Sequence, residues 1–125
     1  MSEAISGSRA RILALASVVE GGTGIALLAV PSTVARLLLG ADVSGVPAAL
    51  GRCFGIALLA LAVACWPGRT GGENGAAAVR AMFAYNALIA LYLAYLAAAG
   101  HVAGPLSWPA VGLHAIVALL LAFLR

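Results

Sequence analysis

The sequence predicts an all-α integral membrane protein: an antiparallel, up-down four-helix bundle with a short interfacial helix between the first and second spanning helices. Two observations predict this class. Of the 125 residues, 64% are hydrophobic and only 9% are charged, whereas a typical soluble domain carries about 25% charged residues. The apolar residues also gather in four runs of 19 to 23 residues, close to the roughly 20 helical residues that cross a bilayer core.

Four spanning helices are therefore expected, within one domain that covers residues 1–125, at residues 12–30, 46–66, 77–99 and 106–124. Strands are not expected, because an open strand leaves unpaired backbone groups in lipid, and the abundant Ala and Leu favour helix. We expect the first run to be retained. It is longer than the roughly 7–15 apolar residues of a signal peptide, and it carries Glu20 near its centre.

The interfacial helix is expected over residues 31–40. Pro31 cannot continue the first helix but fits the first turn of a new one, and Gly40 is suited to end it. The segment is too apolar for a free loop and too short to span. Arg36 would face the headgroups, while Val34 and Leu37 would dip towards the acyl chains.

The distribution of basic residues predicts the orientation. The chain has no lysine, and with this topology two arginines lie on one side of the membrane and five on the other: Arg36 and Arg52 against Arg9, Arg11, Arg69, Arg80 and Arg125. The positive-inside rule then places both termini in the cytoplasm. The net charge of +3 reflects this topology, and no nucleic-acid partner is expected, since no basic patch is interleaved with aromatic residues.

Each predicted spanning helix carries one conspicuous polar residue: Glu20, Arg52, Asn86 and His114. At about 1.5 Å per residue, Glu20, Asn86 and His114 lie about 12–14 Å inside the membrane, and Arg52 about 9 Å. A charge facing lipid at that depth costs at least about 2.5–3.5 kcal/mol. We therefore expect all four to face inward, with Glu20 either protonated or paired to Arg52. The long Arg52 side chain can alternatively snorkel towards the outer surface. A pair of Glu20 with Arg52 is either a structural clamp or part of a working site.

Small residues around the polar centre predict close helix packing. Glu20 and Gly24 are expected on one face of the first helix, together with Ser17 and Thr23, and Gly51 and Gly55 form a GxxxG spacing in the second.

Three tyrosines form a loose stripe on the third helix: Tyr85, Tyr92 and Tyr95. This stripe either packs against other helices or lines a slot for a flat or long apolar ligand, such as a quinone or a lipid tail.

Other chemistry finds little support. Cys53 and Cys65 are about 18 Å apart along one helix, so they cannot form a disulfide with each other. His114 has no partner at metal-ligand spacing, and no nucleophile-base set is recognisable. We expect no metal and no cofactor, and the sequence supports enzyme chemistry only weakly.

Taken together, the chain resembles a group of small bacterial four-helix membrane proteins without an assigned function. The segments that carry the resemblance cover most of the chain: EGGTGIALL followed by Pro31, LLLG, GRCFGIALLALAVACW, AMFAYN and WPAVGLHA. The resemblance implies a four-helix fold in a bacterial inner membrane and no particular activity. Glu20 also gives an architectural analogy to small multidrug-resistance transporters, but Arg52 and a different aromatic and glycine pattern separate the two.

Three functions remain open on the sequence alone. The favoured one is a membrane protein that binds an apolar small molecule, lipid or quinone around the polar centre, or that serves as an accessory subunit of a larger membrane complex. The residues expected there are Glu20, Arg52, Asn86, His114, Tyr85 and Tyr92. The second function is a dimeric, proton-coupled transporter that uses Glu20. The third is a membrane enzyme in which Glu20, Arg52 and His114 act on a lipid-soluble substrate.

Overall fold

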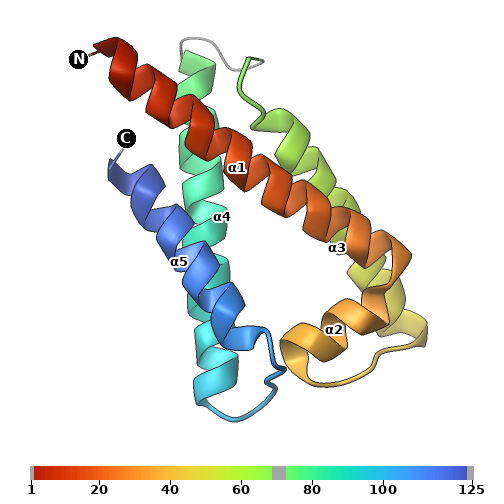
Figure 1. Ribbon diagram of the computed structural model, residues 1–125. Helices are drawn as coiled ribbons and strands as arrows, with labels where there is room; N and C mark the ends of the chain where they lie inside the picture. The colour runs from red at the N-terminus through yellow and green to blue at the C-terminus, as the bar shows by residue number, and fades with distance from the viewer. Residues whose placement is uncertain (1, 69–72, 124–125) are drawn as a thin grey trace.

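The protein is all-helical in the computed structural model, which describes residues 2–68 and 73–123. No strand occurs within those two ranges. They hold five helices, drawn in Figure 1: α1 (Ser2–Ala29), α2 (Pro31–Leu39), α3 (Gly45–Ala64), α4 (Glu73–Ala98) and α5 (Ser107–Phe123).

Three of these helices are long and apolar enough to cross a membrane, over Gly7–Ala29, Gly45–Ala64 and Gly75–Ala98. The fourth apolar helix, α5, has 17 residues and is shorter than the roughly 20 that a bilayer core requires. The last residue of the span predicted over 106–124 lies outside the described residues. The all-helical class is confirmed, and so is a short helix between the first two long ones.

The helix boundaries differ from the predicted spans, because hydropathy locates the segment buried in lipid and not the ends of the helix. α1 begins at Ser2, ten residues before the predicted start at residue 12. The extra turns contain Ala and Arg, which favour helix in water as well. At the other end, Pro31 occupies the first turn of α2, and Gly40, with φ of 79°, ends that helix in the left-handed conformation.

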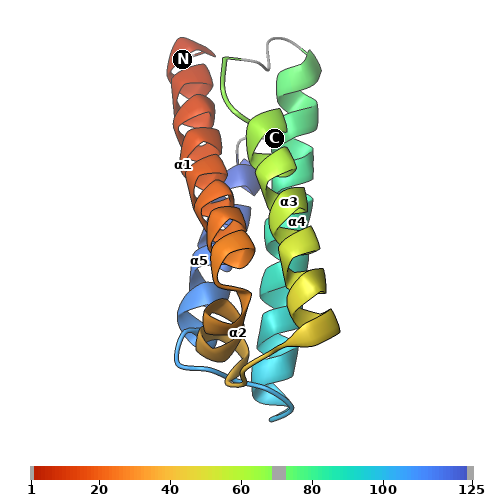
Figure 2. The same ribbon diagram turned by 90° about the vertical axis from the view of Figure 1, so that its right-hand side faces the viewer.

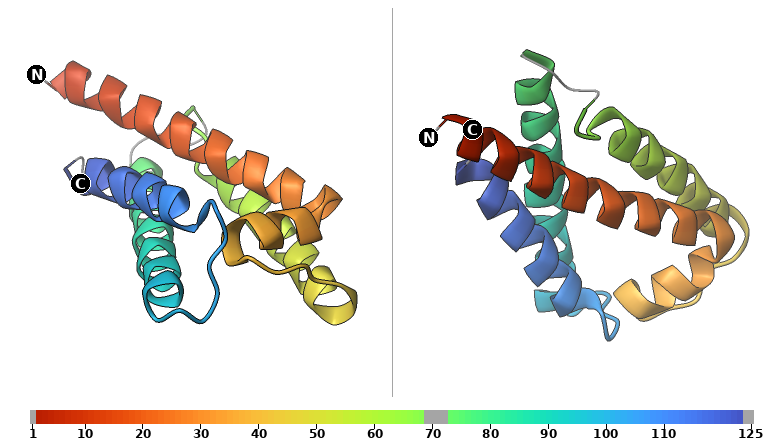
Figure 3. Two further views of the ribbon diagram at one scale, coloured as in Figure 1. Left: turned by 60° about the horizontal axis from the view of Figure 1, so that its bottom comes forward. Right: turned by 45° about the horizontal axis from the view of Figure 1, so that its top comes forward.

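The four longer helices form two pairs. α1 packs along α3, and α4 packs along α5, as Figure 2 shows. The pairs are joined mainly through the contacts of α1 with α4 and α5, whereas α3 has almost no contact with α4 or α5 among the described residues. The first turns of α1 and the last turns of α5 lie at one end of the molecule, and α2 lies at the other (Figure 3).

A buried apolar cluster joins the two pairs near the end where α1 begins and α5 ends. Its members come from α1, the end of α3, α4 and α5: Leu13, Ala16, Cys65, Ala78, Val79, Met82, Val117 and Leu121. The Cys65 thiol reaches the Ala78 carbonyl at 3.7 Å. Most other large apolar side chains face outward. The packing therefore depends on this cluster, which joins the two pairs, and on the glycine contact described next, which joins α1 to α3.

Gly24 and Gly55 bring the backbones of α1 and α3 together. A Cβ atom added to Gly24 would lie 2.7 Å from the Gly55 carbonyl oxygen, and one added to Gly55 would lie 2.7 Å from the Gly24 carbonyl oxygen. Gly51, one turn before Gly55, lies against Pro31. The predicted role of these glycines in close helix packing is confirmed.

The loop between α4 and α5 is hydrogen-bonded to the C-terminal end of α2. The amides of Gly104 and Leu106 donate to the carbonyls of Leu38 and Leu37 at 3.1 and 2.9 Å. The Ser107 hydroxyl donates to the Leu38 carbonyl and accepts from the Gly104 amide. Carbonyls at the end of α2 that have no partner within the helix are thereby satisfied, and α2 is fixed to the start of α5.

The glycine contact predicts a sharp position dependence for alanine substitution. We expect Gly24→Ala to lower the stability of the α1–α3 pair by about 1–3 kcal/mol, because the added methyl group overlaps the Gly55 carbonyl. Gly22→Ala is the matched control, since a Cβ there meets no atom within 4 Å. Unfolding of the purified protein in mixed micelles measures both, and equal stabilities would contradict the packing.

The junction of α2 and α5 predicts a local change in amide protection. We expect Ser107→Ala to raise hydrogen exchange at the Gly104 and Leu106 amides about fivefold. The substitution removes the hydroxyl that links the Gly104 amide to the Leu38 carbonyl, which weakens the junction that also holds Leu106. Ser44→Ala serves as the control, since the Ser44 side chain makes no capping hydrogen bond. Unchanged exchange in both variants would show that Ser107 does not hold this junction.

Candidate functional site

Glu20 is the buried acid in the middle of α1, with 1% of its surface exposed. Its carboxylate faces the other helix pair: Oε1 lies 3.6 Å from Nδ1 of His114 on α5. The Tyr85 side chain of α4 also interacts electrostatically with this carboxylate. Glu20 therefore lies where α1 meets the α4–α5 pair.

Asn86 and His114 form the hydrogen-bonded part of the site. The Asn86 amide nitrogen donates to the Met82 carbonyl of its own helix at 2.9 Å. This leaves the Asn86 Oδ1 atom to accept from His114 Nδ1, 2.8 Å away. The bond requires a proton on Nδ1, so it fixes the position of one imidazole proton and aims it near Glu20.

Tyr85 closes the site on the α4 side. Its ring meets the His114 imidazole edge to face, with centroids 6.0 Å apart and the planes at 83°. This edge-to-face arrangement is a favoured geometry for two aromatic rings. Together, Glu20, Tyr85, Asn86 and His114 form a polar cluster that three helices contribute, and we call it the polar centre.

Neither oxygen of the Glu20 carboxylate makes a hydrogen bond of good geometry, although both are buried and the Tyr85 side chain interacts with the carboxylate. The 3.6 Å contact with His114 is too long for a hydrogen bond. A buried polar group without a partner costs about 1–3 kcal/mol, and more when it is charged. The carboxylate is thus available to accept a hydrogen bond or to exchange a proton with its surroundings.

The expected pairing of Glu20 with Arg52 is not found. The Arg52 side chain is exposed, and its Nε atom donates to the Leu28 carbonyl at 3.2 Å. Leu28 lies eight residues beyond Glu20, which is about 12 Å along α1. Arg52 also projects from α3, whereas Glu20 faces α4 and α5. The Arg52 guanidinium therefore bonds near the C-terminal end of α1, away from Glu20.

The tyrosine stripe divides in the same way. Tyr85 lies in the polar centre, but Tyr92 and Tyr95 are more than half exposed, and Tyr95 lies beside His101. Tyr92 lies seven residues after Tyr85, which is about two turns further along α4 and away from Glu20. Neither Tyr92 nor Arg52 therefore joins the other predicted residues of the site.

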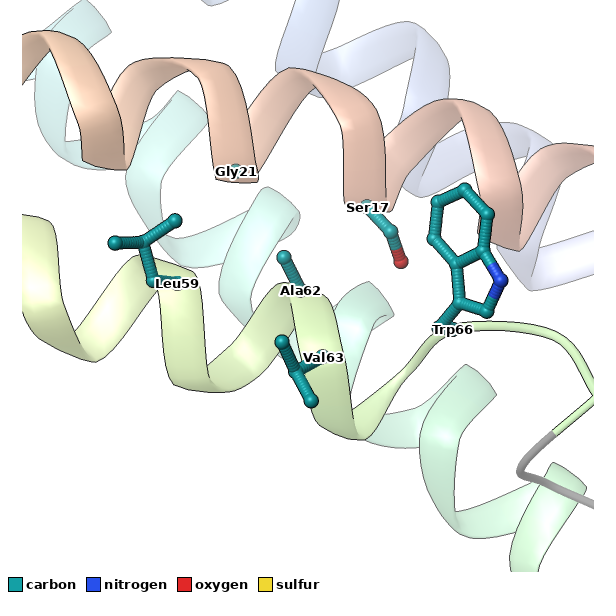
Figure 4. A pocket seen from close by; sticks show the side chains of 6 residues that line it. All are labelled: Ser17, Gly21, Leu59, Ala62, Val63 and Trp66. Atoms are coloured by element: carbon teal, nitrogen blue, oxygen red, sulfur yellow. The ribbon is translucent and has the colours of Figure 1, made fainter.

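The expected single polar face of α1 also separates into two. Gly24 faces α3, whereas Glu20 faces His114. Thr23 satisfies its own hydroxyl by donating to the Val19 carbonyl at 2.9 Å. Ser17, which the sequence analysis had grouped with Glu20, is buried without a hydrogen-bond partner and borders an open groove against α3 (Figure 4).

Among residues 2–68 and 73–123, no group of three histidine, cysteine or acidic side chains is placed to hold a metal ion. Cys53 and Cys65 are both free thiols. The chemistry available in the polar centre is thus hydrogen bonding and proton exchange.

No protein family, curated protein or solved structure matched this chain in the three comparisons.

The unpaired carboxylate predicts that the polar centre lowers the stability of the fold. We expect Glu20→Met, which keeps similar volume, to raise unfolding stability by about 1–3 kcal/mol, because it removes a buried acceptor without a partner. Asn86→Leu should lower stability, since it leaves His114 Nδ1 without its acceptor. A loss of stability in Glu20→Met, measured by unfolding in mixed micelles, would instead identify Glu20 as a structural clamp.

Proposed function

We propose that this chain is a small integral membrane protein that binds a lipid-soluble small molecule at the polar centre. The single observation that carries the proposal is the Glu20 residue, which is 1% exposed and whose carboxylate oxygens make no hydrogen bond of good geometry. Ionisable groups within spanning helices are costly and are usually retained for function. A ligand with a hydrogen-bond donor on its polar head would satisfy the carboxylate.

The membrane arrangement in this proposal has four spanning helices in antiparallel order. The three long apolar helices support it, and α5, with 17 residues, reaches the lower limit for a spanning helix. Five of the seven arginines then lie on the side of the termini, which favours cytoplasmic termini. The resemblance to small bacterial four-helix proteins supports a bacterial inner membrane as the location in this proposal.

The arrangement of the helices offers the ligand a route. Among the described residues, the α1–α3 and α4–α5 pairs are joined mainly through α1 and α2, so in this proposal a small rotation of one pair against the other gives a ligand access to Glu20. The side chains around that space are suited to a head group such as a quinol. Glu20 accepts a hydrogen bond, and Tyr85 supplies an aromatic wall and a hydroxyl.

A second candidate, proton-coupled transport by a dimer, is favoured by the short distance between Glu20 and His114. An acid 3.6 Å from an imidazole can exchange a proton with it after a small movement of either side chain. Four helices alone barely enclose a pathway, so this function requires a second copy of the chain.

Two measurements test the proposal on protein purified in mild detergent. The first identifies any lipid-soluble compound in an organic extract of the protein, and the second titrates the protein with a short-chain benzoquinol. We expect the wild type to retain a lipid-soluble compound in stoichiometric amount or to bind the quinol. Glu20→Gln should weaken binding at least tenfold, because the amide cannot act as the charged acceptor. Asp42→Asn is the control, since Asp42 is an exposed acid beside Arg36.

Two results would overturn the proposal. Binding that is equal in wild type and Glu20→Gln would remove Glu20 from the site. Absence of any bound compound, combined with a proton flux in proteoliposomes that Glu20→Gln abolishes, would favour the transporter.

A further inference from the structure

An open groove lies between α1 and α3, on the side of α1 that packs against α3. Its volume is about 290 Å³, and Figure 4 shows its lining side chains from both helices: Ser17, Gly21, Leu59, Ala62, Val63 and Trp66. Five of these six residues present only apolar surface or an indole. The groove is therefore shaped for an apolar chain and has one polar group at its wall.

That polar group is the Ser17 hydroxyl. Ser17 is 2% exposed, and its oxygen has no hydrogen-bond partner. In Figure 4 the side chain points from α1 towards α3, between Ala62 and Trp66. The hydroxyl of Thr23, on the same helix, is by contrast satisfied by the Val19 carbonyl. Ser17 therefore holds a hydrogen-bond donor at the groove that nothing in the described chain uses.

The position of Trp66 sets the level of the groove in the membrane. Trp66 follows directly after the end of α3 at Cys65, and tryptophan side chains favour the boundary between the hydrocarbon and the headgroups. The groove runs from this boundary past Val63 to Leu59, about two turns deeper along α3. Ser17 lines the same groove as Trp66, at the end of the groove that is next to this boundary.

We propose that this groove binds one acyl chain of an ester-linked glycerolipid. The acyl chain lies over Gly21 and Ala62, beside Leu59 and Val63, and the ester carbonyl accepts a hydrogen bond from the Ser17 hydroxyl. The Trp66 indole covers the glycerol end. The inference rests on the membrane location in the proposed function but not on a ligand at the polar centre, because Ser17 and Glu20 face different helices.

Gly21 is the residue that makes space for the chain. A Cβ atom added there would lie 3.5 Å from the Cβ of Ala62, which is an ordinary contact, so a side chain fits the backbone but occupies the groove. At the adjacent Gly22, an added Cβ meets no atom within 4 Å. Gly21→Val and Gly22→Val are therefore matched variants, and only the first fills the groove.

The first experiment counts bound lipid by native mass spectrometry. The full chain is purified in mild detergent, exposed to diacyl phosphatidylcholine, and compared with the two valine variants. We expect one retained lipid per chain in the wild type and in Gly22→Val, and a loss of at least tenfold in Gly21→Val. Circular dichroism of both variants confirms that the helices remain intact.

The second experiment tests the hydrogen bond from Ser17. A dialkyl ether phosphatidylcholine with the same headgroup and chain length lacks the carbonyl. We expect the wild type to prefer the ester lipid about three- to tenfold, as one hydrogen bond predicts. Ser17→Ala should bind both lipids equally. Thr23→Val is the control, because the Thr23 hydroxyl already bonds within α1.

Three outcomes would overturn the inference. They are a wild type that retains no lipid, a Gly21→Val variant that retains as much as Gly22→Val, and equal binding of ester and ether lipids by the wild type. Displacement of the lipid by a short-chain quinone at equal concentration would assign the groove to another ligand. Absence of the chain from the membrane fraction would instead refute the proposed function.

Discussion

The close approach of Gly24 and Gly55 is the contact on which the rest of the structure depends. With no side chain at either position, the backbones of α1 and α3 touch, and a methyl group on either glycine would overlap the carbonyl oxygen of the other. This contact fixes the rotation of α1 about its own axis. Ser17 and Gly21 then face the groove against α3. Glu20, about 60° around the helix from Ser17 and about 100° from Gly21, faces α4 and α5.

Glu20 acquires its surroundings from that rotation. The helix pair α4–α5 supplies an imidazole whose Nδ1 proton is held by Asn86 and a tyrosine ring at right angles to it. Neither gives the carboxylate a hydrogen bond, so the site keeps an unused acceptor in an apolar surrounding. Stability alone favours an apolar side chain at this position, which is the reason to connect Glu20 with function.

The two sides of α1 carry different chemistry. On the α3 side, a serine donor lacks an acceptor. On the α4–α5 side, a glutamate acceptor lacks a donor. Both groups are buried, and both lie on the same central turns of one helix. A ligand carbonyl can accept a hydrogen bond from Ser17, and a ligand hydroxyl can donate one to Glu20. In our proposals α1 therefore has separate binding sites for a lipid and for the head group of a small molecule.

The sequence by itself determined the all-helical class, the apolar spans and the short helix after Pro31, because composition, run length and proline geometry are local properties. It also predicted a similar depth for Glu20, Asn86 and His114, because depth follows from residue counts along each helix. Only the tertiary structure decided which of them meet. Arg52 lies at the level of Leu28 and Tyr92 faces outward, since helix rotation and pairing depend on contacts between distant segments. The junction of Ser107 with the end of α2, 69 residues away in the chain, could not be predicted for the same reason.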